Sequence, residues 1–84
     1  MIELEYWSAS WCGPCKMMKP ILNELEAEGL TITRFDTDDN LDEARSRRIG
    51  AVPTMIIKKD GQEVERLIGA KDKRTLQLRL QHHS

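Results

Sequence analysis

The sequence predicts an α/β fold in which a four-stranded mixed sheet is flanked by three helices, in the order βαβαββα. Strand-like runs rich in aliphatic and aromatic residues alternate with segments whose apolar residues recur at helical spacing. Between the last two strand-like runs, Asp60 and Gly61 form an Asp-Gly pair that indicates an antiparallel hairpin. Because the chain shows no repeat, linker or low-complexity tract, we expect residues 1–84 to form one domain.

The first two elements are a strand and a long helix. Residues 2–8 predict the strand because aliphatic and aromatic residues alternate there with polar ones. From residue 12 to about residue 28 the apolar residues recur at helical spacing, and Gly29 supplies a C-terminal stop. Pro20 lies inside this segment, where its ring clashes with the preceding turn, so we expect a kink in the helix.

The next two elements are a strand over residues 31–36 and a short helix over about residues 41–48. The charges of the second segment suit a helix, because Asp42 and Glu43 lie in its first turn and arginines lie toward its end. Gly50 then provides the expected stop. These charges indicate a solvated helix face and not a binding surface.

The last three elements are two strands and a terminal segment. Residues 54–58 and 63–68 predict antiparallel strands joined by the hairpin. Asp72 can cap a final helix that carries Leu76 and Leu80 at i and i+4 spacing. The alternating leucines from 76 to 80 also fit a strand, so local pattern leaves this segment open, and we assign it as a helix.

Composition and charge exclude several classes of protein. Thirteen basic residues stand against fourteen acidic ones, and a formal net charge of −1 gives no general attraction to nucleic acid or to an anionic membrane. The N-terminus lacks the features of a secretory signal, and no apolar run approaches the roughly 18 residues of a membrane span. We expect a cytoplasmic monomer that recognises its partners through local surfaces.

Cys12 and Cys15 are the only cysteines, and they lie where the first predicted helix begins. A structural disulfide is a poor explanation for them, because so short a loop removes little chain entropy and cytosolic thiols are kept reduced. Backbone N–H groups at a helix N-terminus favour an anion, so a thiol there ionises more readily and can attack a disulfide. We therefore predict Cys12 as the nucleophile and Cys15, about one turn later, as the residue that resolves the mixed disulfide.

The residues around the cysteines suit this chemistry better than metal binding. Gly13 permits a close backbone approach, and the fixed φ of Pro14 suits the first helical turn. Trp11 would offer a substrate an apolar surface beside the sulfur, although an aromatic residue can also pack in a core. Zinc needs about four ligands, and the only other soft candidates, His82 and His83, lie at the chain end, where we expect disorder. We predict no metal and no cofactor.

With these residues in view, the chain resembles the thioredoxin family over nearly its whole length. The resemblance is carried by Ala9, Trp11-Cys12-Gly13-Pro14-Cys15-Lys16, Pro20, Val52-Pro53-Thr54, Gly61 and Gly69, in the order of the family's landmarks. It implies a minimal thioredoxin fold and reduction of disulfides by dithiol exchange. It also implies a cis-proline at Pro53 that faces the cysteines, with Val52 and Pro53 lining the groove that binds the substrate backbone. A proline at the start of a strand also occurs without such a role.

Two features depart from the family pattern. Thioredoxins usually carry a strand and a helix before the active-site strand, so we expect a trimmed sheet with one less covered face, where Glu3 and Glu5 are tolerated. Tyr6 falls where the family commonly buries an aspartate, and Arg34 falls where it commonly places a lysine. Without that carboxylate, Cys15 would rely on water, on the leaving thiolate, or on the Tyr6 hydroxyl as a hydrogen-bond partner, unless Tyr6 is a plain core aromatic.

The function that we predict is reduction of protein disulfides, with a thioredoxin reductase as the electron donor. An alternative within the same chemistry is a glutaredoxin-like protein recharged by glutathione, which the short chain suggests. A third possibility is a binding module that uses the surface of Trp11, Val52 and Pro53 without redox chemistry. Docking alone does not need a thiol at a helix entrance, and this favours the enzyme.

Overall fold

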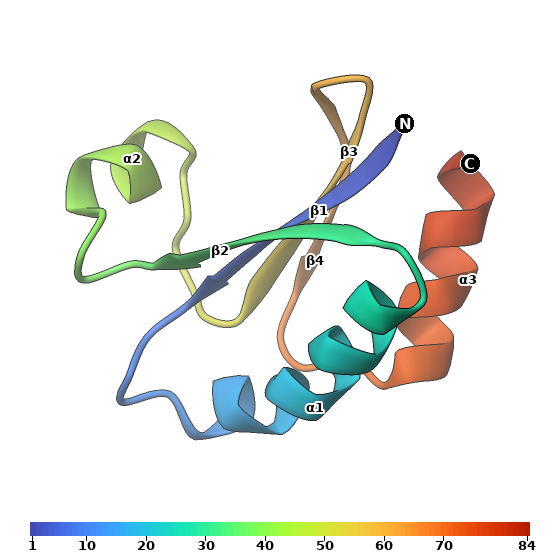
Figure 1. Cartoon of the computed structure of the whole chain (residues 1–84). Coiled ribbons are helices and arrows are strands. Elements are labelled where there is room, and N and C mark those ends of the chain that lie inside the picture. The colour runs from blue at the N-terminus through green and yellow to red at the C-terminus, as the bar shows by residue number, and fades with distance from the viewer.

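The computed structural model describes residues 1–84, with the elements in the predicted βαβαββα order (Figure 1). These are β1 (Ile2–Ser8), α1 (Gly13–Ala27), β2 (Thr31–Asp36), α2 (Leu41–Ser46), β3 (Thr54–Lys59), β4 (Gln62–Ile68) and α3 (Lys73–His83). The strands form one sheet in the order β2-β1-β3-β4, in which β1 and β2 are parallel and the other pairs are antiparallel. The predicted fold class is confirmed.

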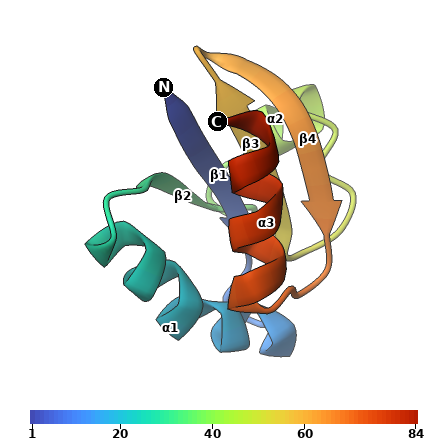
Figure 2. The ribbon, with the colours of Figure 1, turned by 90° about the vertical axis from the view of Figure 1, so that its right-hand side faces the viewer.

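The helices lie on both faces of the sheet. α1 and α3 cover one face, and α2 lies against the other (Figure 1 and Figure 2). The larger core fills the space between the sheet, α1 and α3, and includes Leu4, Met18 and Leu76. A smaller core with Trp7 and Ile56 lies beside α2. Because successive side chains of a strand point to opposite faces, β1 contributes to both cores. No helix is both long and apolar enough to cross a bilayer.

The first helix begins and ends where its sequence predicts. Cys12 is its N-cap, Pro14 lies in its first turn and Glu28 is its C-cap. Gly29 follows with φ of +106°, in the left-handed region that commonly ends helices. Pro20 lies inside α1 and does not end it, and the kink expected there stays a prediction.

The second helix ends earlier than predicted. Its last residue is Ser46, and the left-handed residue after it is Arg48, with φ of 56°, where Gly50 was expected to supply the stop. The physical reason lies on β4, because the guanidinium of Arg66 donates to the carbonyls of Arg47 and Arg48 at 2.8 and 2.9 Å. A side chain distant in the sequence thus satisfies the helix end.

The hairpin between β3 and β4 has the predicted turn. Asp60 and Gly61 have φ of 52° and 87°, so both occupy the left-handed region that a two-residue hairpin of this kind requires. The N-terminal ammonium of Met1 lies 2.6 Å from Asp60 Oδ1. Because Met1 precedes β1 and the cysteines follow it, the hairpin lies at the end of the sheet opposite the cysteines.

The terminal segment, which the local pattern left open, is helix α3. The N–H of Thr75 donates to the side chain of Asp72 at 2.7 Å, which confirms the predicted cap. The disorder expected for His82 and His83 is wrong, because both belong to the last turn of α3. His83 Nε2 lies 2.7 Å from Glu65 Oε1 on β4, and this contact fastens the end of the helix to the sheet.

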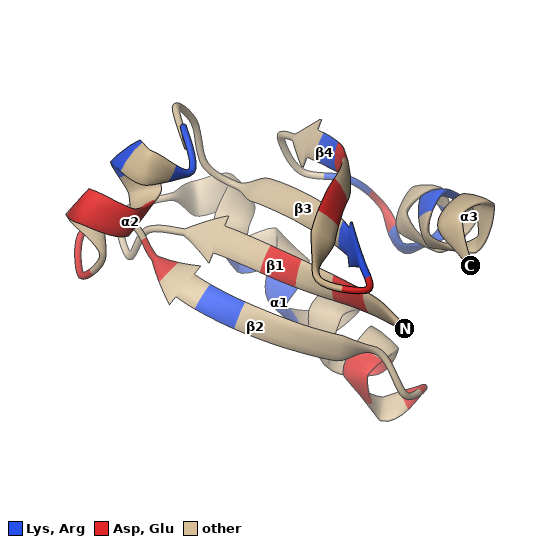
Figure 3. Ribbon diagram, turned by 90° about the horizontal axis from the view of Figure 1, so that it is seen from above, with Lys and Arg blue, Asp and Glu red and all other residues tan.

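One face of the sheet is covered by α2 alone, as expected, but Glu5 on that face is buried. Figure 3 shows this face of the sheet, with α2 over one end and the acidic segments of β1 in view. Glu5 is 7% exposed because Arg47 and Lys58 close over it, with donor distances of 3.0 and 3.2 Å to its Oε2 atom. Two cations therefore compensate for burying this carboxylate. Glu3 is only partly buried.

Candidate active site

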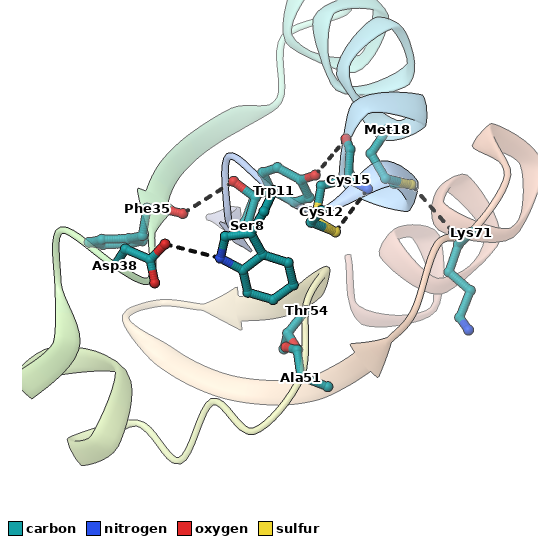
Figure 4. Close-up of a disulfide and its surroundings, with 11 residues drawn as sticks. Ser8, Trp11, Cys12, Cys15, Met18, Phe35, Asp38, Ala51, Thr54 and Lys71 are labelled. Atoms are coloured by element: carbon teal, nitrogen blue, oxygen red, sulfur yellow. Dashed lines mark hydrogen bonds between the residues drawn. A yellow bond between two sulfur atoms is a disulfide. The ribbon is translucent and has the colours of Figure 1, made fainter.

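Cys12 and Cys15 form a disulfide where the loop after β1 enters α1 (Figure 4). Their Cα atoms lie 5.3 Å apart, and the two residues are 4% and 5% exposed. Gly13 and Pro14, between them, are exposed, and an added Cβ on Gly13 would meet no atom of the chain within 4 Å. The space over Gly13 is thus open to an approaching molecule, while the cysteines themselves lie largely beneath the surface.

The two sulfur atoms have unequal surroundings. The backbone N–H of Cys15 donates to Cys12 Sγ at 3.2 Å, and Cys12 is the N-cap of a helix of 15 residues. The unpaired N–H groups of such a helix give its N-terminus a partial positive charge. No hydrogen bond of this kind reaches Cys15 Sγ. Negative charge is therefore better stabilised on the Cys12 sulfur, although the two residues are equally buried.

Tyr6, on β1, contacts the first turn of α1 and is 5% exposed. Its hydroxyl donates to the backbone carbonyl of Cys15 at 2.9 Å, so the hydroxyl is hydrogen-bonded to the helix backbone and not to a sulfur. Burial raises the pKa of Tyr6, and the positive charge of Arg34 opposes this. Arg34 itself donates to Asn23 and Glu26 on α1 at 3.0 and 2.6 Å. No carboxylate takes the place of the family's buried aspartate.

Trp11 extends over the surface beside the disulfide. It is 69% exposed, which excludes a role as a core aromatic. Its indole Nε1 donates to Asp38 Oδ2 at 3.0 Å, so the ring is held in one orientation (Figure 4). Asp38 lies in the turn after β2, and no local pattern in the sequence marks it as part of the site.

The segment from Gly50 to Pro53 forms the other side of the site. Its Val52–Pro53 peptide bond is cis, as the resemblance implied. Val52 and Trp11 line a shallow groove of about 140 Å³, together with Thr37, Ile49, Gly50 and Ala51. Pro53 is fully buried and does not line this groove, and its carbonyl accepts the N–H of Gly69 at 2.8 Å. The structure therefore brings Trp11 and Val52 to one surface and places Pro53 behind it.

Comparisons with known proteins agree over most of the chain. The family model described as Thioredoxin matches residues 2–82. The thioredoxin of Mycobacterium tuberculosis (strain ATCC 25618 / H37Rv) is 45% identical over 78 residues, which cover 89% of this chain and 66% of that protein. The chain thus spans just under two thirds of the length of that relative. A bifunctional thioredoxin reductase/thioredoxin of Mycobacterium leprae is 43% identical over 78 residues, with 89% of this chain and 17% of that protein covered.

Solved structures show the same likeness. The crystal structure of a thioredoxin from Nicotiana alata superposes with a TM-score of 0.90 at 37% sequence identity. The match covers 98% of this chain and 72% of the Nicotiana chain. Sequence and fold therefore point to one family.

Proposed function

The chain belongs to the thioredoxin family, and from this we propose that it is a thiol–disulfide oxidoreductase that reduces protein disulfides with Cys12 and Cys15. One observation carries the proposal more than any other. The two cysteines are close enough to be joined, and Cys12 Sγ sits at the N-terminus of a long helix, where it accepts a backbone N–H. A disulfide with a purely structural role needs no such donor.

The first step is attack by the reduced protein on its substrate. The Cys12 thiolate attacks one sulfur of the substrate disulfide, a new S–S bond forms to Cys12, and the other substrate sulfur leaves as a thiolate. The N–H of Cys15 and the helix N-terminus stabilise the negative charge on Cys12 before attack. The helix therefore lowers the cost of forming the nucleophile.

The second step releases the substrate. The Cys15 thiolate attacks Cys12 Sγ, the bond between Cys12 and the substrate breaks, and the second substrate sulfur leaves as a thiolate. The protein ends in the disulfide form seen here, having given up two electrons and two protons. A neutral phenol is too weak a base to take a proton from a thiol, and the Tyr6 hydroxyl hydrogen-bonds to the Cys15 carbonyl, so the proton of Cys15 passes to water or to the thiolate released in the first step.

Substrate recognition is assigned to the surface between Trp11 and Val52. The indole is fixed by Asp38 and offers an apolar platform, while the groove beside Val52 leaves room for an extended chain. The open space over Gly13 lets the substrate backbone approach the disulfide. These placements support the substrate-binding roles predicted for Trp11, Gly13 and Val52.

The electron donor that we propose is a thioredoxin reductase. The Mycobacterium leprae relative carries both thioredoxin reductase and thioredoxin in its name, which supports this pairing. A coupled assay separates the two candidate donors. Turnover of a protein disulfide with NADPH and a thioredoxin reductase supports the proposal, whereas turnover only with glutathione and glutathione reductase would assign the alternative.

Trapping tests the roles of the two cysteines. The Cys15→Ser variant lacks the resolving thiol and is expected to hold substrates as mixed disulfides on Cys12. The matched Cys12→Ser variant should hold none, and mass spectrometry of the adducts identifies the bound partners. If Cys12→Ser formed the adducts and Cys15→Ser did not, the assignment of roles would be reversed.

A further inference from the structure

A second groove shares no lining residue with the groove at Val52. It has a volume of about 420 Å³ and opens between the first turns of α1 and the end of β2. Tyr6, Cys15 and residues 8–10 contribute to its lining. The groove lies at the carboxyl ends of the parallel strands β1 and β2, close to the usual position of ligand crevices in open α/β sheets. Its size is that of a small-ligand or side-chain site.

The charged residues around this groove are mostly basic. Lys16, Lys19 and Arg34 line it, against a single acidic residue, Asp36. One oxygen of Asp36 already accepts the backbone N–H of Asp38 at 2.8 Å. Glu26 pairs with Arg34 at 2.6 Å, so the excess of positive charge in the groove rests on Lys16 and Lys19, in a molecule whose net charge is −1.

The three cations are available to a ligand in different ways. Lys16 and Lys19 are exposed, and neither has a carboxylate within salt-bridge distance in the chain. Arg34 is oriented by Asn23 and Glu26, but both of those bonds come from its Nη2 atom. A guanidinium has five N–H donors, so the rest of the Arg34 fork stays free to donate into the groove.

The apolar lining of the groove strengthens the interaction of these charges with an anion. Ala9, Phe35 and the ring of Tyr6 give it apolar walls, and charges interact more strongly beside such walls than in bulk water. The charge of Arg34 lowers the pKa of the Tyr6 hydroxyl against the larger effect of burial, so the field of Arg34 reaches the groove floor. An anion in the groove would meet this field directly.

We propose that the groove between α1 and β2 receives a carboxylate side chain of the disulfide substrate, so that the protein prefers substrates with an acidic residue near the disulfide. This inference rests on the proposed function. A substrate joined to Cys12 in the mixed disulfide is tethered beside the groove, because Cys15 and Lys16 lie about one helical turn further on. Tethering raises the effective concentration of that carboxylate far above that of a free anion.

The test uses two peptides that contain the same disulfide and differ only by Glu or Gln close to one cysteine. Their kcat/KM values are compared for the wild-type protein, for Lys16→Gln and for Lys19→Gln. The matched control is Lys59→Gln, which removes the same charge at the hairpin end of the sheet. We expect the wild-type protein to prefer the Glu peptide by about fivefold at low salt, and each groove variant to reduce this ratio by about twofold to fivefold.

The outcomes separate the inference from the function beneath it. If the wild-type protein turned over neither peptide, the proposed function itself would fail. Equal kcat/KM values for the two peptides, or an equal loss of preference in Lys59→Gln, would overturn the groove as the cause. Suppose that the wild-type protein showed no preference between the peptides and that millimolar free N-acetylglutamate inhibited its turnover of the Gln peptide. The groove would then be reassigned to a free anion, and the substrate role would be overturned.

Discussion

The hydroxyl of Tyr6 donates a hydrogen bond to the backbone carbonyl of Cys15 across 2.9 Å. This contact links the middle of β1 to the first turn of α1, which carries one cysteine of the disulfide. A tyrosine at this position therefore acts as a support for the resolving cysteine. It cannot donate the same proton to a sulfur while this bond is made.

Removal of that hydroxyl should affect stability more than the chemistry of the second step. Tyr6→Phe removes the side-chain donor to the buried carbonyl of Cys15, and we expect a loss of about 1 kcal/mol in the free energy of unfolding in urea. The pH profile for release of substrate from the mixed disulfide on Cys12 should stay that of the wild-type protein. A clear change in that profile with Tyr6→Phe would show that the hydroxyl takes part in proton transfer.

The ionisation of Tyr6 provides a second prediction, because it is the only tyrosine in the chain and its absorbance can be followed alone. Burial raises its pKa above 10.0, with Arg34 acting in the opposite direction. A phenol whose pKa is higher in the folded state contributes stability below its unfolded pKa and loses it as pH rises through the folded pKa. We expect the midpoint of the Tyr6 absorbance titration to lie at higher pH in the native protein than in urea. Tyr6→Phe should lose less stability at alkaline pH than the wild-type protein. Equal midpoints would contradict the burial.

The bond between Trp11 and Asp38 is expected to matter for protein substrates. Asp38→Leu removes the acceptor and frees the indole, whereas Asp38→Asn keeps an oxygen at the same position. We expect kcat/KM for a protein disulfide to fall about twofold to fivefold in Asp38→Leu and to change less in Asp38→Asn, as for an exposed charged hydrogen bond. Wild-type kinetics in Asp38→Leu would mean that the orientation of Trp11 has no role.

The buried Glu5 should make stability depend on acid pH. Burial raises its pKa, but hydrogen bonds from Arg47, Lys58 and Trp7 together lower it more, so the pKa lies below 4.5. A carboxylate with a lowered pKa contributes stability above its unfolded pKa, and that contribution is lost as pH falls through the folded value.

We expect Glu5→Gln to lose about 1 to 3 kcal/mol of unfolding free energy at pH 7, because Lys58 would lose its carboxylate and Arg47 would keep only Glu43, at 3.8 Å. The variant should also lose less stability than the wild-type protein below about pH 4.5. Glu3→Gln is the matched control on the same strand and should change little. Equal acid sensitivity in Glu5→Gln and in the wild-type protein would exclude Glu5 as its source.

The sequence was sufficient for features that depend on local chemistry and insufficient for those that depend on distant partners. The hairpin at Asp60 and the stop at Gly29 follow from backbone preferences that neighbouring residues reveal. The end of α2 does not, because Arg66 reaches it from another strand. The role of Asp38 was also hidden, since its partner Trp11 lies 27 residues away in the sequence.

The unequal surroundings of the two sulfur atoms lead to the last prediction. Because the helix N-terminus and the N–H of Cys15 stabilise charge on Cys12, the reduced protein should react with iodoacetamide at Cys12 first. After brief exposure at neutral pH, tandem mass spectrometry should find one label, and the fragment ions should place it on Cys12 and not on Cys15. Cys15→Ser should be labelled at a rate similar to that of the wild-type protein, and Cys12→Ser more slowly by at least about tenfold. Equal rates in the two variants would show that the position of Cys12 at the helix entrance does not activate its thiol.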